Sequence, residues 1–214
     1  MHTQDIKGIA AISKDLFASC SRDSTVVVWQ RNVSGTTPRA VFTEHTKYVN
    51  CLAYMQPDAS WPNGLLCSAG QETIVYQFDP LTLQIAYTLV GHSDNVCALA
   101  AGLHLLVSAS WDRTVRVWRD GVCIHTLSSH SQAVWGVLLV SNDTTVVTAS
   151  ADNSIKIWSN GVVAKSIDGA HKDVVRSLVD IPGYGFVSCS NDAYPSHNSA
   201  LSVSGPTLVH SSER

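Results

Sequence analysis

Charge is scarce in this 214-residue sequence. Charged residues make up 14% of the chain, the net charge is -3, and no run of Lys and Arg is longer than two residues. Binding to nucleic acid or to an anionic membrane surface needs positive charge concentrated in one region. The sequence therefore indicates no nucleic-acid partner and no membrane partner.

Paired cysteines and long hydrophobic runs are also lacking. The six cysteines form no CxxC pair, and most of them lie within apolar stretches. A zinc site or a disulfide framework is the alternative, but this pattern favours free, buried thiols, with no metal and no cofactor. The longest apolar stretch, residues 96–107, is too short to cross a bilayer, and the first 15 residues lack a secretory signal pattern. We expect a soluble, intracellular protein.

One phrase of eleven residues is abundant instead. Its complete copies begin at positions 19, 68, 108 and 148, and a fifth copy, "SCSND", begins at position 188 and then stops. In each complete copy an acidic residue precedes an aromatic residue by six positions. These pairs are Asp23 and Trp29, Glu72 and Phe78, Asp112 and Trp118, and Asp152 and Trp158.

A second marker recurs upstream of each copy. A histidine is followed four residues later by Val or Ile, at intervals of 43, 47, 38 and 41 residues. The five histidines are His2, His45, His92, His130 and His171. A period near 40 residues, with β-branched alternating runs and short Asx-Gly turns, predicts four-stranded blades stacked around an axis. No helical periodicity is visible, so we expect an all-β fold.

Two stretches, "SASWDRTVRVW" and "GHSDNV", resemble the signature of the WD-repeat family. The resemblance covers residues 2–192 and implies an incomplete WD40-type β-propeller of about five blades, the last one broken. We predict a propeller fragment over residues 1–192 and an irregular, Ser-rich tail over residues 193–214. We also expect the chain to be a fragment or a truncated product with two unpaired strand edges.

The recurring Asp, His, Ser or Thr, and Trp invite comparison with a hydrolase. A hydrolase needs one activated nucleophile at one position, whereas this set occurs in every repeat. We therefore predict a structural network and no enzyme. The resemblance implies that the acid contacts the histidine, the histidine contacts the hydroxyl, and the hydroxyl contacts the indole N–H. The predicted sets are His92, Ser108, Asp112 and Trp118; His130, Thr148, Asp152 and Trp158; and His2, Ser19, Asp23 and Trp29.

The resemblance also implies that two positions in each blade point to the narrow face of the propeller. One position precedes the acid, and the other follows the Val of the first strand. The residues that we predict to bind a partner on this face are Trp111, Trp135, Arg22, Arg176, Lys7, Asn50 and Gln71. Exposed Trp and Arg are enriched at binding hot spots. The alternative is that both indoles are packed between blades.

The stretches "QPDASWPNGLL", "SWDRTVRVW" and "AVWGV" sharpen the resemblance to the N-terminal propeller of the phospholipase A2-activating protein family. This resemblance implies a ubiquitin-binding adaptor of the cytoplasm and nucleus, with a role in ubiquitin homeostasis and proteasome-linked degradation. It implies that Trp111 and Trp135 meet the apolar patch of ubiquitin. The family's contact with the AAA+ segregase valosin-containing protein would use regions missing from this chain. A generic WD-repeat scaffold with another partner is the alternative.

Overall fold

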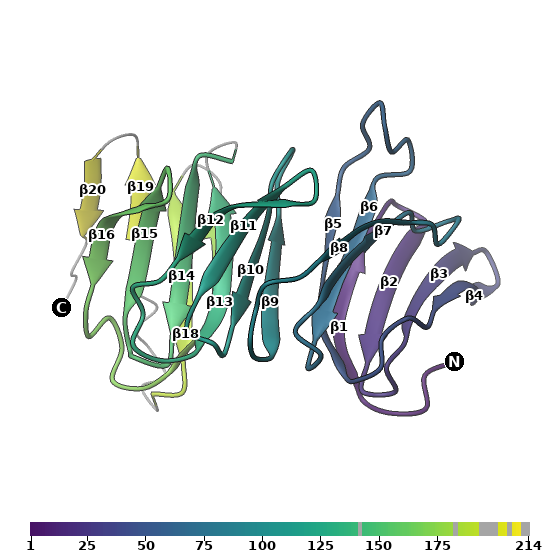
Figure 1. Cartoon of the computed structure of the whole chain (residues 1–214), viewed down its shortest axis with the longest axis horizontal. Coiled ribbons are helices and arrows are strands. Elements are labelled where there is room, and N and C mark those ends of the chain that lie inside the picture. Colours follow the sequence, from purple (N-terminus) through teal and green to yellow (C-terminus); the bar gives the residue numbers. More distant parts are fainter. Residues whose placement is uncertain (141–142, 182–183, 193–200, 205–206, 211–214) are drawn as a thin grey trace.

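The computed structural model describes residues 1–140, 143–181, 184–192, 201–204 and 207–210. Within these ranges the chain forms β-strands and turns and no helix, so it contains no apolar helix of membrane-spanning length there. The strands make five four-stranded antiparallel sheets, which follow one another along the molecule in chain order (Figure 1). We call these sheets blades one to five.

The strands of each blade are consecutive in sequence. Blade one contains β1 (Ile6–Ala11), β2 (Leu16–Ser21), β3 (Val26–Asn32) and β4 (Gly35–Phe42). Blade two contains β5 (Val49–Met55), β6 (Leu65–Gly70), β7 (Val75–Phe78) and β8 (Ile85–Leu89). Blade three contains β9 (Val96–Ala101), β10 (Leu106–Ser110), β11 (Val115–Arg119) and β12 (Val122–Leu127). Blade four contains β13 (Val134–Val140), β14 (Thr145–Ser150), β15 (Ile155–Ser159) and β16 (Val162–Ile167). Blade five contains β17 (Val175–Ile181), β18 (Gly185–Ser190), β19 (Leu201–Ser204) and β20 (Thr207–His210).

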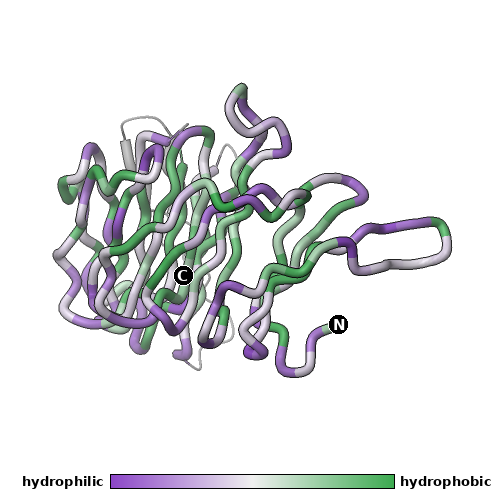
Figure 2. Tube along the Cα trace, turned by 45° about the vertical axis from the view of Figure 1, so that its right-hand side comes forward, coloured by the Kyte–Doolittle hydropathy of each residue, from purple (hydrophilic) through white to green (hydrophobic). Residues whose placement is uncertain are grey.

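Position within a blade decides how each strand is buried. The second strands of the inner blades lie between neighbouring sheets, and every residue of β6 and β10 is buried. Small and apolar residues on both faces fit this double burial. The fourth strands lie at the rim, and β16 is mostly exposed. Apolar residues are accordingly concentrated in the strands, and hydrophilic residues are concentrated in the connecting loops (Figure 2).

Apolar clusters fill each junction between consecutive blades. The first strands β1, β5, β9, β13 and β17 contact one another in chain order, and the second strand of each blade contacts the first strand of the next. Each cluster combines residues from two blades; for example, Val28 of blade one packs with Leu66 and Phe78 of blade two. The structure is therefore the propeller arrangement that the repeat predicts.

The tail differs in part from the sequence prediction. We expected irregular chain over residues 193–214, but β19 and β20 add two strands to blade five. The reason lies in the stretches "LSVS" and "TLVH", in which apolar residues occur within short β-forming runs. The position near 198, where the fifth repeat would place its aromatic residue, lies outside the described residues.

Candidate functional site

A chain of buried hydrogen bonds crosses blade three. The Nδ1 atom of His92 lies 2.7 Å from a carboxylate oxygen of Asp112, and its Nε2 atom lies 2.8 Å from Ser108 Oγ. The indole N–H of Trp118 donates to the same hydroxyl oxygen over 2.8 Å. An ionised Asp112 accepts only, so a neutral His92 donates from Nδ1 and accepts from the Ser108 hydroxyl at Nε2. Each polar side-chain group in this network of blade three therefore has a hydrogen-bond partner.

The same network recurs in the other blades. In blade four, His130 lies 2.9 Å from Asp152 and 2.7 Å from Thr148, to which Trp158 donates over 2.9 Å. In blade one, His2 lies 3.0 Å from Asp23 and 2.8 Å from Ser19, to which Trp29 donates over 2.7 Å. The structure therefore brings together all three predicted sets.

Two blades carry shorter versions of the network. In blade five, His171 contacts Asp192 and Ser188 at 3.0 and 2.8 Å. In blade two, His45 contacts Glu72 and Ser68, but Phe78 has no N–H to donate. Phe78 instead stacks on Phe42 with the ring centroids 3.9 Å apart.

In blades one, three and four, the acid of the network also holds the turn between the second and third strands. Asp112 accepts from the hydroxyl of Thr114 over 2.7 Å and from the backbone N–H of Ser93 over 3.0 Å. Burial raises the pKa of Asp112, but the hydrogen bonds from His92 and Thr114 outweigh burial and hold that pKa well below its usual value. An ionised Asp112 therefore fixes the backbone directly after Trp111.

Trp111 and Trp135 form a pair at one end of the blades. Their ring centroids lie 5.2 Å apart at an interplanar angle of 58°. Trp111 is 41% exposed, and Trp135 is partly exposed beside it. Trp111 lies in the turn after β10 and Trp135 in β13, so the pair bridges blades three and four. The two indoles are thus accessible and are not sealed between blades.

The indole pair lines one side of a hollow of about 390 Å³ at this end of the propeller. Asn50 donates to the side chain of Asn95 over 2.7 Å, which joins blades two and three within the hollow. Lys7 and Arg22 supply positive charge, and no acidic residue is among the lining residues. The residues around the hollow are Lys7, Arg22, Tyr48, Asn50, Gln71, Asn95, Cys97, Trp111 and Trp135. Six of the seven residues predicted for partner binding are therefore brought together.

The seventh, Arg176, contacts the pair from blade five. Its guanidinium carbon lies 4.3 Å from the ring centroid of Trp135, within the range of a cation–π interaction. Asn191 holds Arg176 in place by accepting from its Nε over 3.1 Å. Arg22, in blade one, lines the same hollow. It pairs with Asp5 at 3.1 Å and lies over the ring of Tyr48. One arginine therefore contacts the indole pair, and a second lies over Tyr48 in the same hollow.

Sequence reasoning missed two residues of the hollow, Tyr48 and Asn95. Both directly precede the Val that begins a first strand, so the histidine marker contains a usable signal for them. Cys97 also lines the hollow. Burial raises the pKa of its thiol to about 12, so this sulfur is protonated and is not a nucleophile at neutral pH.

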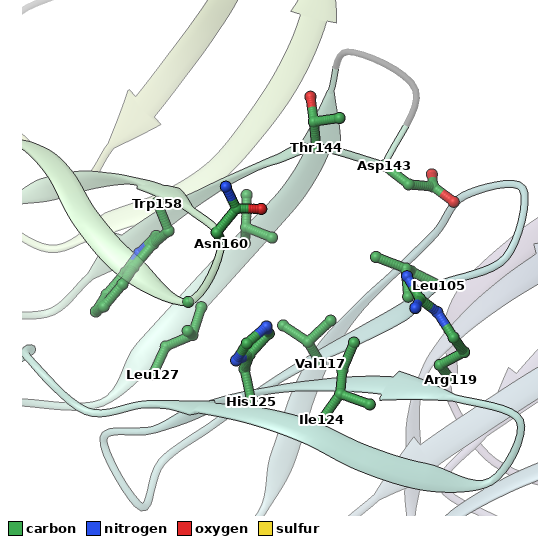
Figure 3. A pocket seen from close by; sticks show the side chains of 12 residues that line it. Leu105, Val117, Arg119, Ile124, His125, Leu127, Asp143, Thr144, Trp158 and Asn160 are labelled. Carbon is green, nitrogen blue, oxygen red and sulfur yellow. The ribbon is translucent and has the colours of Figure 1, made fainter.

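A smaller cavity of about 90 Å³ lies between blades three and four, away from the indole pair (Figure 3). His125 and Asn160 border it, together with the apolar side chains of Leu105, Leu127 and Trp158. Leu105, Leu127 and Trp158 belong to the cluster that packs blade three against blade four. This cavity is therefore a packing seam. Within the described residues, no three His, Cys, Asp or Glu side chains are grouped as metal ligands would be.

Comparison with known proteins gives the same architecture. The model of a protein family described as "WD domain, G-beta repeat" matches residues 2–30, 36–79, 83–119 and 121–159. The crystal structure of the WD40 beta propeller domain of Doa1 superimposes with a TM-score of 0.80 and 35% sequence identity, over 90% of this chain and 64% of that chain.

Two curated relatives are similar over a large part of the chain. Ubiquitin homeostasis protein lub1 of Schizosaccharomyces pombe is 36% identical over 192 residues, which cover 89% of this chain and 26% of lub1. Phospholipase A-2-activating protein of Xenopus laevis is 35% identical over 149 residues, which cover 65% of this chain and 18% of that protein. The chain thus spans about a quarter or less of the length of these relatives.

Proposed function

This chain belongs to the WD-repeat family, and from that premise we propose that it is a non-enzymatic adaptor that binds ubiquitin. A relative that carries the words "ubiquitin homeostasis" in its name matches 89% of the chain. The matched region is the propeller, so the proposed contact has to be made by propeller residues.

The observation that carries the proposal is the indole pair of Trp111 and Trp135. Two tilted indoles 5.2 Å apart present a shallow apolar surface with N–H groups at its edges. Arg176 lies over Trp135 and Arg22 lines the same hollow, and Trp with Arg is the composition of protein-binding hot spots. A small, half-exposed aromatic surface suits a weak contact with the apolar patch of ubiquitin.

The assignment as an adaptor draws support from the placement of the reactive residue types. The Ser or Thr, His and acidic side chains that recur in every repeat belong to the networks. Ser108, the candidate nucleophile of blade three, is fully buried and already bonded to His92 and Trp118. A nucleophile has to reach its substrate, so these groups are better suited to holding the turns.

We place this adaptor in ubiquitin homeostasis and proteasome-linked degradation, in the cytoplasm and nucleus. In this proposal the chain supplies recognition of ubiquitin or ubiquitinated proteins. Binding to the AAA+ segregase valosin-containing protein would require regions other than these 214 residues.

Calorimetric titration of the chain with monoubiquitin tests the proposal. We expect the wild type to bind ubiquitin. The Trp111→Ala and Trp135→Ala variants should each bind it about tenfold more weakly, because each removes a hot-spot indole. Tyr184→Ala is the matched control, since Tyr184 is 74% exposed in the turn between β17 and β18, away from the indole pair.

The control variant should bind ubiquitin as the wild type does. Unchanged affinity in both Trp variants would remove the site from the proposal. Absence of binding by the wild type would reject ubiquitin as the partner and favour a WD-repeat scaffold with a different one.

A further inference from the structure

A cavity of about 70 Å³ lies in the seam between blades two and three, at the opposite end of the strands from the indole pair. Trp111 of that pair follows β10, whereas Leu103 and His104, which border this cavity, precede β10. The cavity occupies the same place in the repeat as the packing seam between blades three and four. Its walls differ from those of that seam in their aromatic, polar and charged residues.

Three aromatic side chains surround the cavity. Trp118 is buried at the inner side, where the guanidinium carbon of Arg116 lies 5.9 Å from its ring centroid. Trp61 and Tyr87 are partly exposed walls. The seam between blades three and four has His125 in the place of Tyr87. An aromatic face attracts a cation, and several faces around one space form the cage that binds ammonium groups.

The wall formed by Trp61 comes from a connection that blade two alone lengthens among the inner blades. This connection covers residues 56–64, whereas its counterpart in blade three covers residues 102–105, and it projects beyond the strands (Figure 1). Asp58 accepts from the backbone N–H of Ser60 over 2.8 Å and from that of Trp61 over 2.7 Å. The backbone N–H of Gly64 donates to the carbonyl of Trp61 over 2.8 Å. A connection held in this way offers its indole without a large ordering cost on binding.

A buried carboxamide supplies a hydrogen-bond acceptor at the inner end of the cavity. Gln77 lines the cavity and is 4% exposed. Its Nε2 donates to Met55 Sδ over 3.1 Å and to Cys67 Sγ over 3.5 Å, while its Oε1 accepts from no donor in the described part of the chain. This oxygen is not fully covered by protein, so it is open to the cavity. In the next seam the corresponding residue is Val117, which has no such acceptor.

Negative charge lies at the mouth of the cavity. Asp58 and Asp120 line it and are exposed, and none of the described residues that line it is Lys or Arg. The seam between blades three and four has Asn160 in the place of Asp120, and both Arg119 and Asp143 border it. The cavity between blades two and three therefore combines aromatic walls, an open acceptor and an acidic mouth.

We propose that this cavity binds an alkylammonium group that retains an N–H, as the side chain of lysine does. The N–H donates to Gln77 Oε1, and the charge and its methylene groups contact the rings of Trp61 and Tyr87. The carboxylates of Asp58 and Asp120 offset the positive charge from the mouth. Burying an ammonium group costs free energy unless it is hydrogen-bonded and its charge is balanced, and these residues meet both conditions.

The size of the cavity and its ligand atoms favour an organic cation over a metal ion. A volume of about 70 Å³ holds roughly five water-sized groups, which is close to the size of a lysine side chain. Metal ions need several oxygen, nitrogen or sulfur ligands. No three His, Cys, Asp or Glu side chains are grouped in this way within the described ranges, and the aromatic walls add no ligand atom.

Nitrogen–proton correlation NMR of the full chain tests the proposal. The probes are a capped glycine peptide with one central lysine and its Nε-dimethyl, Nε-trimethyl and Nε-acetyl forms. We expect saturable shifts at Trp61, His104 and Asp120 with the lysine and dimethyl-lysine peptides. The trimethyl form should bind roughly tenfold more weakly, because it has no N–H for Gln77. The acetyl form, which is neutral, should not bind.

A titration with n-butylammonium distinguishes two sources of the same group. Tighter binding of the lysine peptide assigns the cavity to a lysine of another polypeptide, whose flanking backbone could contact the exposed Leu103 beside the mouth. Tighter binding of n-butylammonium assigns it to a free amine. Either result supports an alkylammonium site.

Three variants test the residues of the cavity. Trp61→Ala should weaken binding of the lysine peptide about tenfold by removing a wall, and Asp120→Asn about threefold by removing a charge at the exposed mouth. Gln77→Val, which introduces the residue type of Val117, should abolish the preference for lysine over trimethyl-lysine. Asp180→Asn removes an exposed carboxylate of β17 and is the matched control, with unchanged affinity.

Absence of saturable shifts with every amine would overturn the proposal. Equal affinity for the lysine and acetyl-lysine peptides would also overturn it, since binding would then need no positive charge. Unchanged affinity in both Trp61→Ala and Asp120→Asn would place the binding elsewhere and reject this site. The remaining signals of each spectrum verify that a variant is folded. No readout involves ubiquitin or the indole pair, so the result is separate from the test of the proposed function.

Discussion

At the scale of single residues, the buried hydroxyl is the centre of each network. Ser108 is fully buried and serves both the imidazole of His92 and the indole of Trp118. Ser68 is equally buried, but it serves only the imidazole of His45, because the aromatic residue of blade two is Phe78. The chain thus contains its own comparison between a hydroxyl with two partners and a hydroxyl with one.

Ser108→Ala should therefore lower the free energy of unfolding more than Ser68→Ala. A buried polar group left without its partner costs about 1–3 kcal/mol. Ser68→Ala leaves one such group and Ser108→Ala leaves two, so the second variant should be less stable than the first by about 1–3 kcal/mol. Urea denaturation of both variants measures the difference, and equal losses would contradict the assigned network.

At the scale of the element, the turn between second and third strands sets the shape of each blade. The residue after the acid adopts a left-handed backbone in four blades: Ser24, Thr73, Arg113 and Asn153 have φ angles of 66°, 71°, 70° and 64°. Asn tolerates this region, whereas a β-branched residue such as Thr is strained there. Blade two therefore carries a strained turn that blade four avoids.

An exchange of these two residues should change stability in opposite directions. Thr73→Asn should stabilise the protein by about 1 kcal/mol, and Asn153→Thr should destabilise it by a similar amount, because the left-handed conformation costs about 1–2 kcal/mol in most residues. Thermal unfolding of both variants checks the signs. A loss of stability in Thr73→Asn would argue against backbone strain at this turn.

The element scale also explains what the sequence could and could not predict. The all-β propeller was predicted from the period of the acid–aromatic and His–Val pairs, and the structure and its Doa1 counterpart confirm it. Strands β19 and β20 were missed, because their stretches "LSVS" and "TLVH" lack the acid and the aromatic residue that mark other repeats. Four-residue strands with no marker give too little periodicity to recognise.

The candidate site was predictable only as far as register alone determines it. Counting from the acid and from the first-strand Val placed six residues around one hollow. Tyr48 and Asn95 were not predicted. Each directly precedes the first-strand Val, and the orientation of that position depends on the curvature between blades. The cation–π contact of Arg176 with Trp135 likewise depends on how blade five packs on blade four.

At the scale of the whole molecule, the carboxylates of the networks couple stability to pH. Burial raises the pKa of Asp23 and of Asp152, but hydrogen bonds outweigh it and lower both values to about 2. Burial lowers the pKa of His130 from 6.5, so protonation of its imidazole opposes folding. Depressed pKa values of both kinds make the folded state bind fewer protons than the unfolded state.

The free energy of unfolding should therefore fall between pH 7 and about pH 2, first as His130 titrates and then as the carboxylates do. The contribution of His130 is complete above pH 6.5 and is lost as the pH falls toward its folded-state pKa. The contributions of Asp23 and Asp152 are complete above their ordinary value of 3.8 and are lost between that value and about 2. Urea midpoints across this range measure the slope.

Asp152→Asn should reduce the loss of stability that the wild type shows below pH 3.8. Asp180→Asn, which changes an exposed carboxyl of β17 outside the networks described, is its control. A profile for the wild type that does not change between pH 7 and about pH 2 would contradict the linkage between these groups and folding.

Each acid is fastened by its network, while the residue just before it is not part of that network. Arg22, Gln71, Trp111, Ala151 and Asn191 occupy this place in successive blades. Five neighbouring positions can thus change their chemistry without disturbing the frame that carries them. Substitutions at these positions could therefore change which ligand the propeller binds while its framework stays the same. Antibodies vary their binding loops on a constant framework in the same way.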